Sequence, residues 1–182
     1  MCIRDQQLVG AALTNGDSDV LLVASSGKAV RFKESDVRAM GRTARGVRGI
    51  KLTDKQTLIS LIIPKENGAI LTASERGYGK RTVVDDFPVK GRGIMGVIAQ
   101  AVTERNGDVV GATQVFEGDE VMLISNQGTL VRTSADGISQ LGRNTQGVKL
   151  INLRDEETLV GLQRIDESED DPAVEGEEDA SE

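Results

Sequence analysis

Short apolar runs alternate with glycine-containing polar turns along most of this chain. In the clearest example, an apolar run at residues 20–24 is followed by a polar turn ending at Gly27 and an alternating segment at residues 28–32. Two β-favouring runs joined by such a turn are typical of a β-hairpin. The pattern recurs twice, so we expect three hairpins, with paired strands at residues 20–24 and 28–32, 69–73 and 78–82, and 121–124 and 129–133.

The hairpins belong to an internal repeat of about fifty residues. A Gly-Arg pair begins at residues 41, 91 and 142, and a Gly-Val pair follows five residues later each time. Apolar pairs at residues 8, 58, 109 and 159 keep the same spacing, and a further apolar strand follows each hairpin at residues 47–52, 97–102 and 148–153. Four short strands in forty to fifty residues are typical of a propeller blade.

We therefore predict an all-β fold, a propeller-like array of four-stranded blades occupying residues 1–165. The array comprises about three blades and a closing strand. The units run approximately over residues 6–56, 57–107 and 108–157, and the closing strand covers residues 158–165. The repeated glycines are explained by turn geometry, because a positive φ favours glycine.

Charge is distributed unevenly along the chain, whose 22 Lys and Arg against 29 Asp and Glu give a formal net charge of −7. Ten acidic residues and no basic ones lie in residues 166–182, so the other 165 residues have 22 basic against 19 acidic residues, a net of +3. We predict a mildly basic body followed by a disordered acidic tail at residues 166–182. The tail would either keep the chain soluble or compete with DNA for the cationic surface, and the sequence leaves both roles open.

Composition limits the possible chemistry. The chain has no His and one Cys, which excludes a His- or Cys-based metal centre and His acid–base catalysis. Carboxylate pairs such as Asp85-Asp86 have no base or nucleophile beside them, which argues against an enzyme in its own right. We therefore expect no metal and no cofactor in this chain. No apolar run approaches the ~20 residues of a membrane helix, so we expect a cytoplasmic protein with no membrane partner.

Basic residues concentrate in the loop after each hairpin, most of all after the first. Segment 42–49 places three Arg among small residues and glycines, which suits close approach to a phosphate backbone. The repeat would place equivalent Arg residues along one rim of successive blades, although charged blade edges that block strand pairing would give the same pattern. The candidate DNA-binding residues are Lys28, Arg31, Arg38, Arg42, Arg45, Arg48, Lys51, Lys80, Arg81, Arg92, Arg132 and Arg143.

Several of these segments resemble the C-terminal domain of the DNA gyrase A protein. The similar segments are residues 27–35 (Gly-Lys-Ala-Val-Arg-Phe-Lys-Glu-Ser), 38–41, 46–50, 77–82 (Gly-Tyr-Gly-Lys-Arg-Thr), 102–107 and 142–148 (Gly-Arg-Asn-Thr-Gln-Gly-Val). They occur in the family's order between about residues 7 and 166. The family's hallmark Gln-Arg-Arg-Gly-Gly-Lys-Gly box is absent, and the loop at its place keeps only Arg42, Arg45 and Gly46.

The resemblance implies a β-pinwheel, in which neighbouring blades exchange strands, and a role in wrapping duplex DNA for negative supercoiling. It also implies partners, namely the rest of the gyrase A protein and the gyrase B protein in an A2B2 holoenzyme that uses ATP and Mg in the bacterial, nucleoid-associated cytoplasm. The family's catalytic tyrosine region and ATPase have no counterpart in this chain, and the only tyrosine, Tyr78, lies in a hairpin.

Two alternatives remain open from the sequence. One is a protein-interaction propeller without a nucleic-acid role, since any blade array offers a binding face and a net charge of +3 on the body is modest. The other is the equivalent domain of the topoisomerase IV A protein, which resembles the chain less closely.

Overall fold

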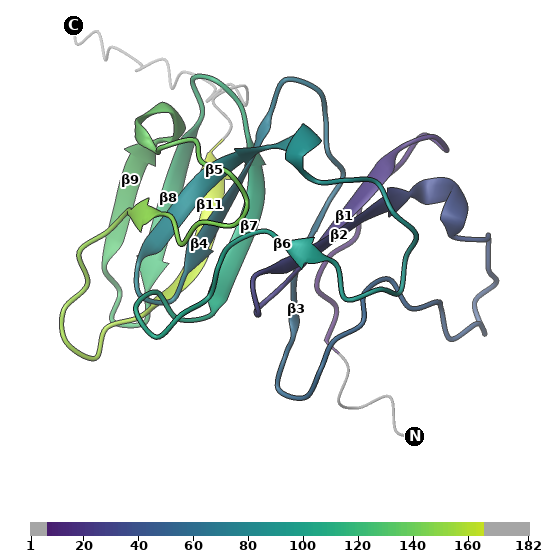
Figure 1. Ribbon diagram of the computed structural model, residues 1–182, viewed down its shortest axis with the longest axis horizontal. Coiled ribbons are helices and arrows are strands. Elements are labelled where there is room, and N and C mark those ends of the chain that lie inside the picture. Colours follow the sequence, from purple (N-terminus) through teal and green to yellow (C-terminus); the bar gives the residue numbers. More distant parts are fainter. Residues whose placement is uncertain (1–6, 166–182) are drawn as a thin grey trace, which may run out of the picture.

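A computed structural model describes residues 7–165, whose regular structure is β apart from three short 3₁₀ turns (Figure 1). The predicted all-β fold is confirmed. The strands are β1 (Asp19–Ala24), β2 (Lys28–Lys33), β3 (Leu58–Ile62), β4 (Ala69–Ser74), β5 (Tyr78–Val83), β6 (Val97–Ile98), β7 (Val109–Val115), β8 (Glu120–Ser125), β9 (Leu130–Ser134), β10 (Val148–Lys149) and β11 (Leu159–Ile165). The 3₁₀ turns are η2 (Glu34–Asp36), η3 (Val84–Asp86) and η4 (Ala135–Gly137).

The strands form three antiparallel sheets, each built around one of the predicted hairpins. Their strand orders are β3-β1-β2-β6, β10-β5-β4-β7 and β11-β8-β9. The strand predicted to close the array is β11, which pairs with β8 and completes the third sheet. The sheets follow one another across the molecule, with β9 near one end and the loop after β2 at the other (Figure 1).

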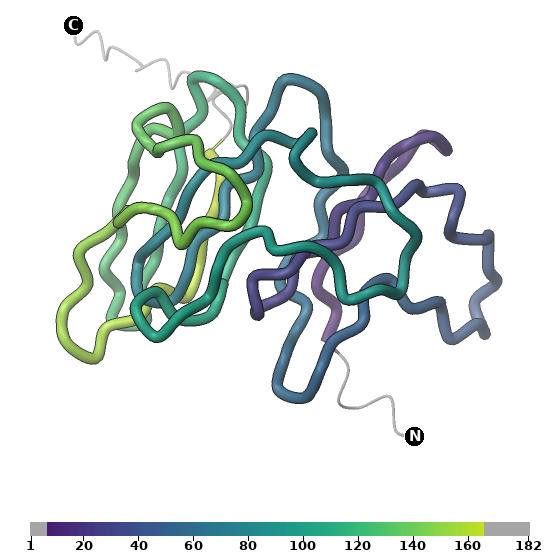
Figure 2. The backbone as a smooth tube through the Cα atoms, in the orientation of Figure 1, coloured from purple at the N-terminus to yellow at the C-terminus, as the bar shows by residue number. Residues whose placement is uncertain are grey.

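Neighbouring blades exchange strands, as the pinwheel expectation requires. The short strand β6 follows the second hairpin in sequence, but it pairs with β2 of the first hairpin at Lys28↔Ile98 and Ala29↔Val97. In the same way β10 follows the third hairpin and pairs with β5 of the second. Figure 2 shows the chain crossing from the end of β5 to the first hairpin before it returns to β7. Each blade is therefore tied to the next by backbone hydrogen bonds.

The sheets group the strands differently from the sequence units. The strands at residues 58–62 and 109–115 were expected to open a unit, yet each pairs with the hairpin that precedes it in the chain. The apolar pair Leu8-Val9, at the same repeat position, forms no strand, and Leu8 is exposed. The physical reason is that a strand of this type needs a preceding hairpin, and none lies upstream of it among residues 7–165.

The apolar core lies between the sheets. Leu21, Val23 and Ala29 of the first hairpin pack against Ile70 and Phe87 of the second blade. A second cluster repeats this contact between the next two blades, with Leu71 and Val115 against Val121, Ala135 and Ile138. The second blade thus buries one face against the first blade and the other against the third.

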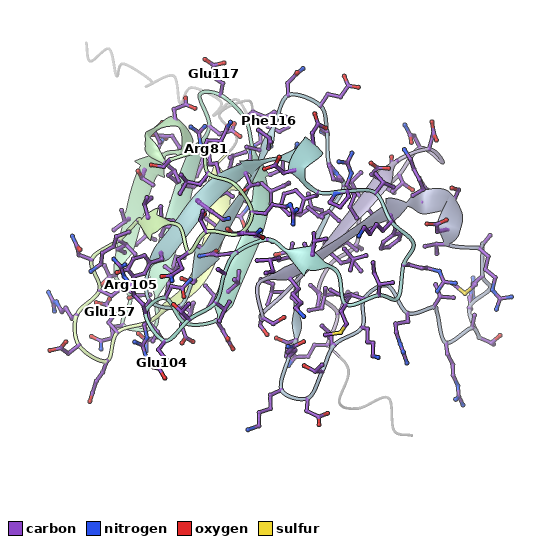
Figure 3. All side chains as sticks on the ribbon, in the orientation of Figure 1. Arg81, Glu104, Arg105, Phe116, Glu117 and Glu157 are labelled. Carbon is purple, nitrogen blue, oxygen red and sulfur yellow. The ribbon has the colours of Figure 1, made fainter. Side chains whose placement is uncertain are left out.

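One polar position of the repeat closes the turn before each outer strand. A side-chain oxygen there accepts the backbone N–H three residues earlier, in the pairs Gln56 with Thr53 (3.1 Å), Asn106 with Thr103 (2.8 Å) and Glu157 with Arg154 (3.0 Å). The Arg154 N–H, together with hydroxyls of Ser125 and Thr129, lowers the pKa of Glu157 to about 2. The buried Glu157 (Figure 3) is therefore explained by its turn.

Candidate nucleic-acid interface

The most exposed cations of the candidate set lie in one loop, residues 37–51, between η2 and β3. They are Arg38, Arg42, Arg45, Arg48 and Lys51, and all five are exposed. Within residues 7–165, none of them forms an ion pair or donates a side-chain hydrogen bond. An exposed cation without a counter-ion is available to an anion, and five on one loop provide a cationic surface.

The backbone of this loop is held by the second blade. Lys51 donates its N–H to Ile94 O (2.8 Å), and Gly93 donates to Gly49 O (2.5 Å). Arg92 donates from Nε to Asp36 O (2.9 Å) and from Nη1 to Arg48 O (3.2 Å). Both ends of the loop are therefore anchored while its cationic side chains extend into solvent.

The repeated Gly-Arg arginines are held by blade-to-blade contacts. Arg143 donates from Nη1 to Ile98 O (3.0 Å), just as Arg92 donates to Arg48 O one unit earlier. Both guanidinium groups are therefore bonded to backbone carbonyls of the preceding unit. Arg42, at the same repeat position, has no preceding blade within residues 7–165 and stays exposed.

The hairpin arginines Arg31 and Arg81 also join blades. Arg31 pairs with Asp19 at 2.7 Å and donates from Nη1 to the carbonyl oxygens of Val84 (2.9 Å) and Phe87 (3.2 Å) in the next blade. Although burial acts to raise the pKa of Asp19, ion pairs with Lys33 and Arg31 outweigh it and lower that pKa. Both arginines were expected at a DNA-binding rim. Their side chains are more than four-fifths buried, and they lie in the contacts between adjacent blades.

Arg81 makes the stronger of these two joints. Its Nε donates to Ile138 O (2.8 Å), its Nη2 to Asp136 O (3.2 Å), and its Nη1 pairs with the Asp136 carboxylate at 3.1 Å. All three contacts reach into the third blade. Three charge-assisted bonds from one planar guanidinium fix the angle between two blades.

Lys80 was expected to be a DNA-binding residue, but its side chain lies in the protein interior. Its Nζ donates to Gly142 O and Arg143 O, each at 2.6 Å. Burial, with the charge of Arg143 as a smaller effect, lowers the pKa of Lys80 to about 8. Because the ammonium is enclosed and already bonded, Lys80 cannot reach a phosphate in this fold. The remaining candidates are Lys28, which is half-exposed, and Arg132, which pairs with Glu120.

The buried ammonium predicts an unusual pH dependence of folding stability. Between pH 8 and about 10.5 the unfolded chain holds a proton on Lys80 that the folded chain has lost, so stability rises with pH in this window. We expect a gain of at most about 2 kcal/mol by pH 10, measured by urea unfolding at several pH values. The first and third hairpins have Val30 and Val131 at the position of Lys80, so Lys80→Val is a conservative test. This variant should lose the rise in stability with pH, and a profile like that of the parent would contradict the prediction.

Three exposed cations of the loop at residues 37–51 have no cationic counterpart in the third blade. Arg38, Arg45 and Lys51 stand where the third blade has Ser139, Gln146 and Asn152. At positions where arginine recurs, Arg31, Arg81, Arg92 and Arg143 each make a blade-to-blade hydrogen bond. Lys90 is exposed and lies two residues before Arg92. It is not among the candidate DNA-binding residues, although its position in a basic loop could have indicated it.

Comparison with known proteins identifies the family. The family model of the "DNA gyrase C-terminal domain, beta-propeller" matches residues 18–65, 69–115 and 119–166. Each match spans one hairpin together with the outer strand that pairs with it. The chain belongs to this family.

Longer relatives agree with this membership. The DNA gyrase A protein of Pseudomonas aeruginosa is 56% identical over 176 residues, which are 95% of this chain and 19% of that protein. The DNA gyrase A protein of Escherichia coli is 53% identical over 169 residues, 93% of this chain and 19% of that protein. The chain thus spans about a fifth of the length of these relatives.

Solved structures show the same fold over about half of their length. A DNA gyrase A C-terminal domain superimposes with a TM-score of 0.75 at 32% identity, covering 81% of this chain and 50% of that one. The C-terminal domain of a DNA topoisomerase IV gives a TM-score of 0.84 at 22% identity, covering 91% and 52%, and shows likeness of fold alone. Residues 7–165 contain no helix long and apolar enough to cross a membrane, and no group of three or more His, Cys, Asp or Glu residues that could hold a metal ion.

Proposed function

We propose that this chain binds duplex DNA without sequence specificity through the loop at residues 37–51, and that it contributes to DNA wrapping by a gyrase. The observation that carries the proposal is the set of five cations on one anchored loop, none of which has a protein counter-ion within residues 7–165. Phosphate contacts of this kind supply affinity and orientation but carry no sequence information.

The architecture supports backbone binding over other modes. The described residues contain no α-helix to enter a major groove. The chain has 2% aromatic residues, so no row of rings is available for stacking unpaired bases. Contacts to the backbone of a deformable duplex are the mode that fits, and a rigid blade array offers a firm surface against which DNA can bend.

Family membership extends the proposal to an assembly. The partners would be the remainder of the gyrase A protein and the gyrase B protein, whose holoenzyme would use ATP and Mg and act in the cytoplasm on nucleoid DNA. This chain's part would be to hold DNA, because its candidate residues offer cations and no reacting group.

Gyrase is favoured over topoisomerase IV because gyrase A relatives reach 56% identity. The topoisomerase IV domain is similar at 22% identity, which reflects the shared fold. A protein-interaction propeller would need no cationic loop, so an absence of DNA binding by the folded chain would favour that alternative.

The test is duplex affinity as a function of salt. The chain should bind a duplex of about 150 base pairs with a log–log salt slope near ~−4, so that affinity falls by about two orders of magnitude between ~50 and ~200 mM salt. Two duplexes of unrelated sequence should give the same curve in a fluorescence anisotropy titration. A salt-insensitive complex, or no complex with a chain that is folded by circular dichroism, would refute the proposal.

A further inference from the structure

Two consecutive apolar residues are exposed beside the cationic loop at residues 37–51. Ile94 and Met95 are 38% and 41% exposed, and neither belongs to the apolar clusters within residues 7–165. We infer that this pair is a wedge that inserts between base pairs of the bound duplex and bends it. The inference rests on the proposed function. Isoleucine and methionine are among the side chains that act as wedges in proteins that bend DNA.

The pair lies against the part of the loop that carries Arg48 and Lys51. The Lys51 N–H donates to Ile94 O (2.8 Å), and Arg92 donates from Nη1 to Arg48 O (3.2 Å). The two segments therefore run side by side, as Figure 2 shows for the teal segment before β6 and the blue loop. Phosphates bound by the two loop cations would bring the duplex over Ile94 and Met95.

The repeat shows that the pair is special to the second blade. The first loop has Ala-Arg at residues 44–45 and the third has Thr-Gln at residues 145–146, so neither has a large apolar side chain there. Thr145 is exposed although both preceding blades are present, so the position faces solvent within the array. Arg45 is one of the cations proposed to bind phosphate. Met95 therefore occupies, one blade later, the place of a proposed DNA contact.

The turn that carries the pair is held at both ends. Gly93 and Gly96 flank it with φ of 77° and 80°. At one end the Gly93 N–H donates to Gly49 O (2.5 Å). At the other end a Cβ on Gly96 would lie 2.2 Å from Ala29 O, so the turn is packed directly on β2. A wedge must keep its position while the base stack resists it, and these backbone contacts supply that support.

The surroundings of the pair select duplex DNA as the occupant of this surface. Exposed cations border the pair on both sides, with Lys90 before it in the chain and Arg48 and Lys51 across from it. Duplex DNA matches this arrangement, because phosphates can contact the cations while stacked bases contact the apolar side chains. A stable protein–protein interface buries roughly 800 Å² per partner, which is far more than two half-exposed side chains supply.

Fluorescence of 2-aminopurine, which increases when this base unstacks, tests the wedge. The full chain should raise the fluorescence of a ~20-base-pair duplex at least about twofold at saturation, with the probe at a central TA step because such steps unstack most easily. Ile94→Thr with Met95→Gln installs the residues of the third blade and should abolish most of this increase. Both changes preserve the net charge, so the log–log salt slope should match that of the parent.

Two control variants separate the wedge from general effects of the substitutions. Val89 is 46% exposed in the same segment, and the third blade has Gln140 at its position. Val89→Gln therefore removes exposed apolar surface nearby and should leave the fluorescence increase unchanged. Ile94→Val with Met95→Leu keeps two apolar side chains and should retain the increase, which distinguishes loss of the wedge from damage to the fold.

The outcomes distinguish the wedge from the proposed function. Salt-dependent binding by the parent without an increase in fluorescence would overturn the wedge and leave the proposed function intact. An undiminished increase with the Ile94→Thr, Met95→Gln chain, or an equal loss with Val89→Gln, would also overturn it. A folded parent that binds no duplex in the anisotropy titration would refute the proposed function, and the inference with it.

Discussion

A chain carrying Arg38→Ser, Arg45→Gln and Lys51→Asn should bind duplex DNA about two orders of magnitude more weakly than the parent near ~0.1 M salt. Each substitution installs the residue that the third blade has at that repeat position, so the fold should tolerate all three. Loss of three phosphate contacts should also flatten the log–log salt slope by ~2 to 3 units. Anisotropy titrations at four salt concentrations would measure both effects.

The control for this variant removes the same charge elsewhere. Arg76→Gln, Arg105→Gln and Arg154→Thr change three arginines that lie in turns outside the loop at residues 37–51. Their loss should leave the slope nearly unchanged, apart from a small effect of net charge. If both triple variants weakened binding equally, the loop would have no special role and general electrostatic attraction would explain the affinity.

Replacing Arg81 with Met should lower the free energy of unfolding by about 3 kcal/mol. The change leaves Ile138 O and Asp136 O without their donor and the Asp136 carboxylate without its cation. Urea unfolding at pH 7 would measure the loss. DNA affinity of the remaining folded chain should stay within twofold of the parent, since the guanidinium is enclosed between blades.

Lys33→Met is the comparison for Arg81. Lys33 pairs with Asp19 at 2.8 Å, but its side chain is half-exposed, so its loss should cost less than about 1 kcal/mol. An Arg81→Met chain that unfolds like the parent but binds DNA poorly would restore Arg81 to the DNA surface and remove it from the joint.

Repetition in this chain marks structure more reliably than it marks binding. Arg31 and Arg81 recur, as do Arg92 and Arg143, because every pair of adjacent blades needs the same joint. A DNA contact is under no such constraint and can occur in one blade alone, as we propose for Arg38 and Arg45. The hypothesis that equivalent arginines line a common DNA-binding rim stays a prediction. For the recurring residues the structure shows hydrogen bonds to a neighbouring blade, which cannot be read from the sequence of one unit.

The sequence by itself determined the hairpins, the fifty-residue period, the all-β class and the family. These features depend on neighbours in the chain, namely alternation within a strand and a glycine at the turn, so local pattern specifies them. The predicted tail at residues 166–182 lies outside the described residues.

Only the tertiary structure decided which hairpin each outer strand joins and which cations remain free. Strand β6 pairs with β2 of the preceding blade, and the buried ammonium of Lys80 bonds to carbonyls of the following one. Such contacts join residues distant in sequence, and a strand's alternating pattern is the same whichever hairpin it pairs with. Which side chains are buried and which strands pair therefore depend on how whole blades pack together. The order of residues within one blade does not specify that packing.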